Sequence, residues 1–147
     1  MNGKTGKQLE LLVERLLNYS FPRAVIRRNV LIRNFEVDLL VNCDREVVDL
    51  HQSKFVVCEC KNWSRPVKMK DWIKFYEKMR ILKELFSRIS AGHLEIEGWL
   101  ISMGGFEEEV RQCTKNVTEF KVKLIDSKQL NKMLQVYGFA PSQLMKD

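Results

Sequence analysis

An apolar run that contains an acid and a base, FVVCECKNW at residues 55–63, constrains this chain more than any other feature. The run is typical of a buried β-strand, yet it includes Glu59 and Lys61. Side chains alternate across a strand, so Glu59 and Lys61 share one face while Cys58 and Cys60 share the other. A buried charge is costly unless it is paired or bound to a metal, so this strand requires a compensating partner.

The rest of the sequence divides into helical and strand-like segments. Apolar spacing predicts helices over residues 6–18, 69–87, 106–120 and 127–138, and β-forming runs predict strands over 23–32, 34–42, 56–61, 95–103 and 122–126. Ser127 is expected to cap the last helix and Gly138 to end it. The short apolar run at residues 46–50 is expected to extend a hairpin. The order α-β-β-β-α-β-α-β-α predicts an α/β fold with a mixed β-sheet between helices.

Length and composition favour one soluble domain. No linker or repeat divides the 147 residues, so residues 1–147 are expected to form a single domain. No apolar run approaches the roughly 20 residues of a membrane span, and the first residues lack a signal-peptide core, so a cytoplasmic protein is expected. The net charge of +6 favours contact with a polyanion, although 19 acidic residues are interleaved with 25 basic ones.

The cysteines have two interpretations. In a reducing compartment they are expected to be small buried residues rather than disulfides: Cys43, Cys58, Cys60 and Cys113. A zinc site would combine Cys58 and Cys60 with His51 or His93, but one C-x-C pair inside an apolar strand matches zinc spacing poorly. The buried-residue interpretation is therefore favoured.

The preceding strand-like segment, FEVDLLV, supplies further acids. Antiparallel pairing of the two strands would bring Asp38 close to Glu59. Neighbouring carboxylates repel each other unless a positive charge lies between them, and hard cations such as Mg²⁺ are held by one or two carboxylates. The sequence therefore predicts a metal site at Asp38 and Glu59, while Glu36 is expected to be a surface residue.

These residues resemble the motif of the PD-(D/E)xK nuclease superfamily, which has the restriction-endonuclease-like fold. Within it, the chain is most similar to Mrr-type restriction endonucleases and archaeal Holliday junction resolvases. Glu59-Cys60-Lys61 matches the second half of the motif and Asp38 the first half, with Val37 in place of the nominal proline. The order and spacing of ECKNW, GWLISMGGFEEEV and VKLIDSKQLNKML extend the similarity over nearly the whole chain.

The resemblance also concerns the first helix, where these families place a glutamate after a glycine. The segment GKQLELLVERLL supplies Gly6 and Glu10, with Glu14 as the fallback.

The resemblance implies a metal-dependent endonuclease that hydrolyses DNA phosphodiester bonds with Mg²⁺ or Mn²⁺ and no organic cofactor. It implies that Asp38, Glu59 and the carbonyl of Cys60 hold the metal and that Glu10 binds a second metal or its water shell. Lys61 would orient or deprotonate the attacking water. Basic residues would hold the nucleic-acid backbone, the candidates being Arg27, Arg28, Arg65, Lys68 and Lys70.

Two other functions stay open: a nuclease acting on RNA or branched DNA, and a catalytically inactive nucleic-acid-binding or assembly module of the same fold. Relatives of this size act as homodimers or beside a recognition domain, so a homodimer and substrate selection by DNA structure, modification or a partner are expected. Trp63 and Trp72 could stack on bases, but packing is favoured. The polar insertion from Cys43 to Lys54 could serve dimerisation, DNA contact or neither.

Overall fold

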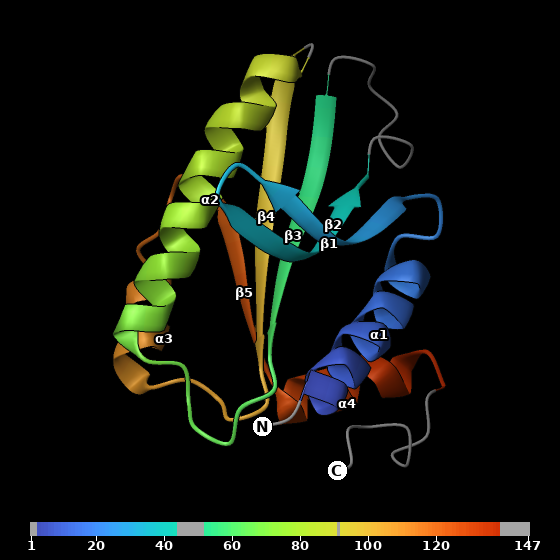
Figure 1. Cartoon of the computed structure of the whole chain (residues 1–147), viewed down its shortest axis with the longest axis vertical. Helices are drawn as coiled ribbons and strands as arrows, with labels where there is room; N and C mark the ends of the chain where they lie inside the picture. Colours follow the sequence, from blue (N-terminus) through green and yellow to red (C-terminus); the bar gives the residue numbers. More distant parts are fainter. Residues whose placement is uncertain (1–2, 44–51, 91, 139–147) are drawn as a thin grey trace.

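The strand-like runs of the sequence form one mixed sheet in a computed structural model, which describes residues 3–43, 52–90 and 92–138 (Figure 1). Within these residues the predicted order α-β-β-β-α-β-α-β-α is confirmed. The elements are α1 (Gly3–Ser20), β1 (Val25–Ile32), β2 (Phe35–Asn42), β3 (Gln52–Lys61), α2 (Met69–Ile89), β4 (His93–Ser102), α3 (Glu108–Thr114), β5 (Lys121–Asp126) and α4 (Ser127–Val136).

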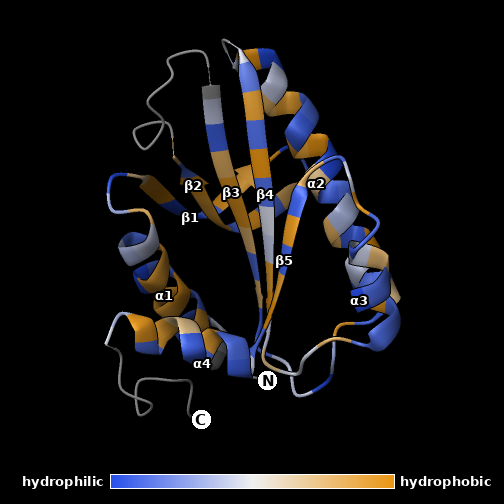
Figure 2. Cartoon of the chain, turned by 180° about the vertical axis from the view of Figure 1, so that it is seen from behind, coloured by the Kyte–Doolittle hydropathy of each residue, from blue (hydrophilic) through white to orange (hydrophobic). Residues whose placement is uncertain are grey.

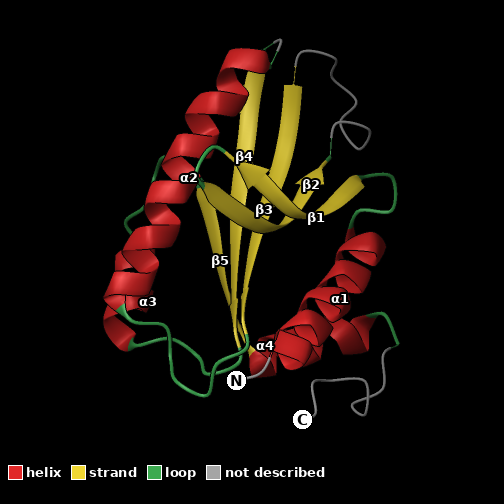
Figure 3. Ribbon diagram, in the orientation of Figure 1, coloured by secondary structure: helices red, strands yellow, loops and turns green. Residues whose placement is uncertain are grey.

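The sheet has the strand order β1-β2-β3-β4-β5 among the described residues. The pairs β1–β2 and β2–β3 are antiparallel, whereas β3–β4 and β4–β5 are parallel. Parallel neighbours require a crossover, which α2 and α3 provide (Figure 3). The α/β fold with a mixed, helix-flanked sheet is thus as predicted.

Helices cover both faces of the sheet, and each face has its own core. Helices α1 and α4 pack with Trp99 of β4 on one side, and α2 and α3 pack with Leu100 of the same strand on the other. Figure 2 shows hydrophobic residues along the strands between the helices. Helix α2 lies so close to β4 that a Cβ added to Gly98 would lie 3.0 Å from the ring of Phe75. Glu59, Lys61 and the cleft described below lie on the α2 side of this sheet.

The predicted helix over residues 106–120 is too long, because α3 spans only Glu108–Thr114. Phe106 forms a β-bridge with Val67, and the buried ring of Phe120 packs against Tyr76 at 5.6 Å between centroids. These tertiary contacts hold Phe106 and Phe120, the two ends of the predicted helix, in non-helical positions.

The last helix begins at Ser127, but Ser127 is its first residue and not its N-cap, so the proposed cap is wrong. Asp126 is the N-cap: its carboxylate accepts the N–H of Gln129 at 2.9 Å, and the Gln129 side chain accepts the N–H of Asp126 at 3.1 Å. The predicted stop at Gly138 is confirmed by its φ of 81° and by its N–H, which donates to the Gln135 carbonyl at 3.0 Å.

The remaining predictions have mixed outcomes. Cys43 and Cys58 are buried as predicted and Cys60 is partly buried, but Cys113 is exposed because α3 turns Val110, not Cys113, toward the core. Residues 46–50 and His51 lie outside the described residues. Of the helices described, none is long and apolar enough to cross a membrane.

Candidate active site

The ladder between β2 and β3 opens partway along its length. It holds four residue pairs and ends at Leu39↔Cys58, whereas β3 pairs with β4 over ten residues, as far as Lys61. One step beyond the last pair, the register sets Asp38 opposite Glu59. Figure 1 shows the β1–β2 hairpin turning across the direction of the other three strands. The strand-side acids of the predicted metal site therefore lie where strand pairing stops.

The hairpin changes its inward face at Asp38. Val37 packs into the α2-side core, whereas Leu39 packs into the α1-side core. In the β1–β2 register the residue opposite Asp38 is Asn29, which has a φ of 52°, in the left-handed region. Backbone strain of this kind concentrates at functional sites. The bend turns the β2 segment before Asp38 away from β3.

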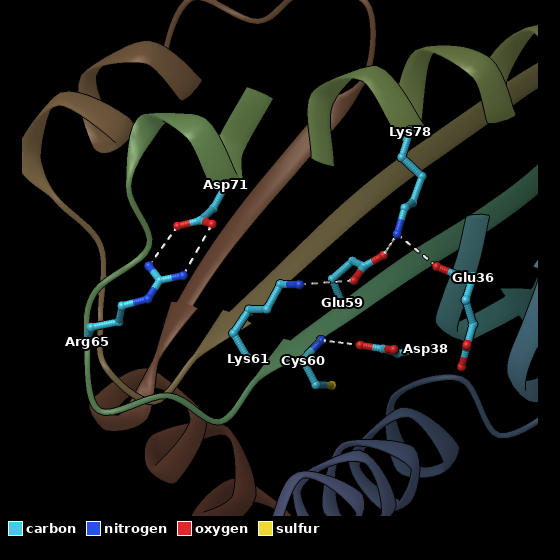
Figure 4. A network of polar contacts seen from close by, with 8 residues as sticks. All are labelled: Glu36, Asp38, Glu59, Cys60, Lys61, Arg65, Asp71 and Lys78. Atoms are coloured by element: carbon cyan, nitrogen blue, oxygen red, sulfur yellow. Dashed lines mark hydrogen bonds and ion pairs between the residues drawn. The ribbon is translucent and has the colours of Figure 1, made fainter. Parts of the chain in front are cut away.

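Asp38 takes the place of a backbone partner at the open edge. Its Oδ2 accepts the N–H of Cys60 at 2.8 Å (Figure 4). This bond confirms the expectation that Asp38 lies beside the Glu59-Cys60-Lys61 segment. Burial raises the pKa of Glu59, and the negative charge of Asp38 raises it further.

Two lysines compensate the buried charge of Glu59, which is 5% exposed. The ammonium of Lys78 contacts Glu59 Oε1, and Nζ of Lys61 lies 3.7 Å from Oε2 (Figure 4). These cations lower the pKa of Glu59 against the effects of burial and Asp38. The compensating partner that the sequence requires is therefore supplied at least in part by the chain itself.

Lys78 also bridges the opening between the two strands. Besides Glu59 on β3, its ammonium donates to the backbone carbonyl of Glu36 on β2 at 2.8 Å. Lys78 could not be singled out from the sequence, because a lysine on the polar side of an amphipathic helix has the same pattern as any surface lysine. Lys78 reaches Glu59 because of where α2 packs on the sheet, and no local sequence motif predicts that position.

Glu10, rather than the fallback Glu14, joins Asp38 from the side of α1. The pKa of Glu10 is raised to about 7, first by burial, then by the negative charges of Asp38 and Glu36, and also by a hydrogen bond to the Asp38 side chain. Glu14 instead lies 3.6 Å from the guanidinium of Arg28. Glu36 has an exposed side chain, as predicted.

The predicted phosphate-binding residues are spread over the surface. Arg65 and Lys70 line the same cleft as Glu59. Arg27 on β1 and Lys68 at the start of α2 are exposed, and Arg28 contacts Glu14.

The cleft lies between β3 and α2 and has a volume of about 700 Å³. Basic, acidic, aromatic and aliphatic side chains line it: Phe35, Glu59, Lys61, Trp63, Arg65, Lys70, Asp71, Ile73, Lys74, Phe75, Glu77, Lys78 and Ile81. Trp72 is buried, so its predicted packing role is confirmed. Trp63 is partly buried against the α2-side core and also forms part of the cleft wall.

The donor chemistry of the opening fits a hard cation. Asp38, Glu59 and the Cys60 carbonyl are oxygen donors, and Mg²⁺ requires only one or two carboxylates beside water and phosphate oxygens. Among the residues that the structure describes, no three His, Cys, Asp or Glu side chains group closely enough to hold a metal. Burial raises the pKa of the Cys58 and Cys60 thiols, which disfavours metal binding by thiolate.

Comparisons with known proteins bear on the fold. No family model matches the chain, and no curated protein matches it. A crystal structure of the protein of unknown function AF1548 is similar, with 17% sequence identity and a TM-score of 0.63 over 95% of this chain and 71% of that chain. A likeness at this identity concerns the fold alone, the mixed α/β sheet flanked by helices.

Proposed function

We propose that this chain is a metal-dependent endonuclease of the PD-(D/E)xK type that hydrolyses DNA phosphodiester bonds. The observation that carries the proposal is the register that sets Asp38 opposite Glu59, where β2 and β3 separate. Lys61 follows on the same face of β3, and Glu10 approaches Asp38 from α1. Four charged residues from three separate segments of the chain, α1, β2 and β3, thus lie around one opening.

Each of these residues has a chemical part in the proposal. Asp38, Glu59 and the carbonyl of Cys60 would hold Mg²⁺ or Mn²⁺, and Glu10 would hold a second ion or bound water. When bound, the metal supplies Lewis-acid chemistry at the phosphate. Lys61 would orient the attacking water and stabilise negative charge on the phosphate from the cleft side.

One specific observation favours a second candidate function. Glu59 is already paired with Lys78 and Lys61, so the same charges could form a purely structural network in a nucleic-acid-binding module without catalysis. The two candidates differ in what Lys61 does, because only the nuclease needs its ammonium for the reaction.

Purified protein incubated with plasmid, linear and branched DNA and with RNA, in Mg²⁺, Mn²⁺ or EDTA, tests the proposal. We expect metal-dependent cleavage of DNA that falls by a factor on the order of 100 or more in Asp38→Asn and in Lys61→Ala. Lys132→Ala on α4 is the matched control and should cut like the wild type. If the wild type and Lys61→Ala behave alike on every substrate, the nuclease assignment is wrong and the binding module remains.

A further inference from the structure

Three lysines follow one side of α2 into the cleft. Lys70, Lys74 and Lys78 are four residues apart and all line it, so their backbone positions rise by about 6 Å per step. The innermost, Lys78, is the one that contacts Glu59. Lys70 and Lys74 are exposed and form no ion pair within the described residues. They form a row of charges leading from the cleft mouth to the candidate active site.

The acidic residues of the cleft do not neutralise the charges of Lys70 and Lys74. Five basic and three acidic residues line the cleft, and each acid already has a cation of its own. Lys61 and Lys78 contact Glu59, Arg65 donates to Asp71 at 2.9 Å, and Arg80 lies 3.8 Å from Glu77. The charges of Lys70 and Lys74 are therefore left for an anionic ligand.

The segment after β3 supplies an aromatic and a planar cationic side chain to the cleft wall, Trp63 and Arg65. The guanidinium of Arg65 lies 3.9 Å from the centre of the Trp63 ring, and the Asp71 carboxylate fixes that guanidinium with two hydrogen bonds. On α2 itself, beside the lysines, Ile73 also lines the cleft and is 51% exposed. Indole rings, guanidinium planes and aliphatic side chains are surfaces on which unpaired bases stack.

We propose that this cleft holds one strand of a nucleic acid that is unpaired at the site. The backbone phosphates would follow Lys70 and Lys74, and a base would lie against Trp63 and Arg65. The inference rests on the proposed function for its orientation, because the strand would lead to Glu59 and Lys61. A cleft of about 700 Å³ is the size of a site for a small ligand, which suits a few nucleotides of one strand rather than a duplex.

Binding measured without cleavage tests the row of lysines. Fluorescence anisotropy of a labelled 20-mer DNA strand would be recorded in EDTA over a range of salt, with Asp38→Asn as the parent protein. We expect Lys70→Gln/Lys74→Gln to weaken binding about tenfold and to reduce the salt slope by about 1.4, since each single-strand phosphate contact contributes about 0.7. Lys128→Gln/Lys132→Gln on α4 is the matched control, with the same charge change and spacing, and should keep the parent slope. Equal losses in both variants would overturn the proposal.

The stacking wall and the strand preference have their own readouts. Trp63→Ala should weaken single-strand binding about tenfold, and Trp63→Phe should recover most of it. A blunt duplex of the same sequence should compete poorly, whereas a duplex with an unpaired arm should compete well; equal competition by the blunt duplex overturns the single-strand assignment.

The two proposals fail separately. If the wild type cuts no substrate while the cleft variants still lose binding, the nuclease assignment is wrong and the strand-binding cleft stands. If the wild type cuts DNA and the cleft variants bind like the parent, the strand-binding cleft is wrong.

Discussion

The two edges of β3 differ in a way that defines the candidate site. Along the β4 edge every residue from Gln52 to Lys61 is paired, so the backbone groups on that side are satisfied by the sheet. Along the β2 edge pairing ends at Cys58, and the next outward N–H, that of Cys60, is bonded by the carboxylate of Asp38. The backbone groups of β3 are thus hydrogen-bonded by another strand on one edge and, beyond Cys58, by a carboxylate on the other.

This difference shows how the sheet makes room for charge without losing its core. On the closed edge the neighbour of Glu59 is Leu100, which is buried. On the open edge the neighbour is Asp38, and the charge is balanced by Lys78 from a helix. The closed edge should thus contribute more stability, through packing, whereas the open edge should contribute less stability and most of the proposed chemistry.

The largest effect on stability is expected on the closed edge. Leu100→Ala leaves a cavity between β3, β5 and α2 and should lower the free energy of unfolding by about 3 kcal/mol, measured by urea denaturation. Leu31→Ala, at a position on β1 that is 74% exposed, is the control and should change it by less than about 0.5 kcal/mol. Similar losses in both variants would contradict the division into a packed and an open edge.

The second effect concerns the bridge across the open edge. Lys78→Met leaves Glu59 with Lys61 alone and removes the bond to the Glu36 carbonyl, so we expect a loss of about 2 kcal/mol at neutral pH. Without Lys78 the pKa of Glu59 should rise further above its unfolded value, so the loss should shrink as the pH falls and Glu59 becomes protonated. Lys74→Met, one turn earlier on α2, is the matched control.

A double variant separates the cost of leaving the Glu59 charge without Lys78 from other effects of the Lys78 substitution. Lys78→Met/Glu59→Gln removes both partners and should recover part of the stability lost in Lys78→Met. If Lys78→Met unfolds at the same urea concentration as the wild type, the bridge does not hold the opening.

The fold was predictable because its signals are local. Periodicity along the chain predicted every element from α1 to α4 in the right order, and the predicted helix was too long where tertiary contacts hold Phe106 and Phe120 outside it. The cap at Asp126 also shows this limit, since Asp126 and Ser127 are both good N-caps and only the backbone geometry decides between them.

The site was only partly predictable for a related reason. Alternation along β3 placed Glu59 and Lys61 on one face, antiparallel pairing placed Asp38 close to Glu59, and the resemblance added Glu10. No sequence pattern singled out Lys78 or the lysines before it, Lys70 and Lys74. Their positions in the cleft depend on how α2 packs on β3. The bend at Asp38 could not be predicted from the sequence either, because simple antiparallel pairing would have continued the β2–β3 ladder past Asp38.

The third effect concerns the repulsion between Glu10 and the other acids at the open edge. The pKa of Glu10 is raised to about 7, above its unfolded value, so its ionisation opposes folding and stability should fall as the pH rises from about 4.5 to about 7. Glu10→Gln should therefore stabilise the metal-free protein by about 1 kcal/mol at about pH 8 and leave it unchanged near pH 4.5. Glu14→Gln, one turn later, should show no such gain. A gain in Glu10→Gln that does not vary with pH would contradict this account.

The smallest effect is expected beyond the end of β3, at the mouth of the cleft. Hydrogen bonds from Arg65 and from the N–H of Lys68 lower the pKa of Asp71 to about 2. A lowered pKa means that the ionised carboxylate stabilises the fold above its unfolded pKa and that this contribution is lost as the pH falls from about 4 to about 2. Because the Arg65 side chain is 41% exposed, Asp71→Asn should cost only about 0.5 kcal/mol at neutral pH, with the difference from the wild type shrinking in acid. Glu77→Gln, which alters a more exposed pair with Arg80, should cost less at neutral pH. A larger loss in Asp71→Asn than in Lys78→Met would place the main electrostatic support of the cleft at its mouth instead of at the open edge of β3.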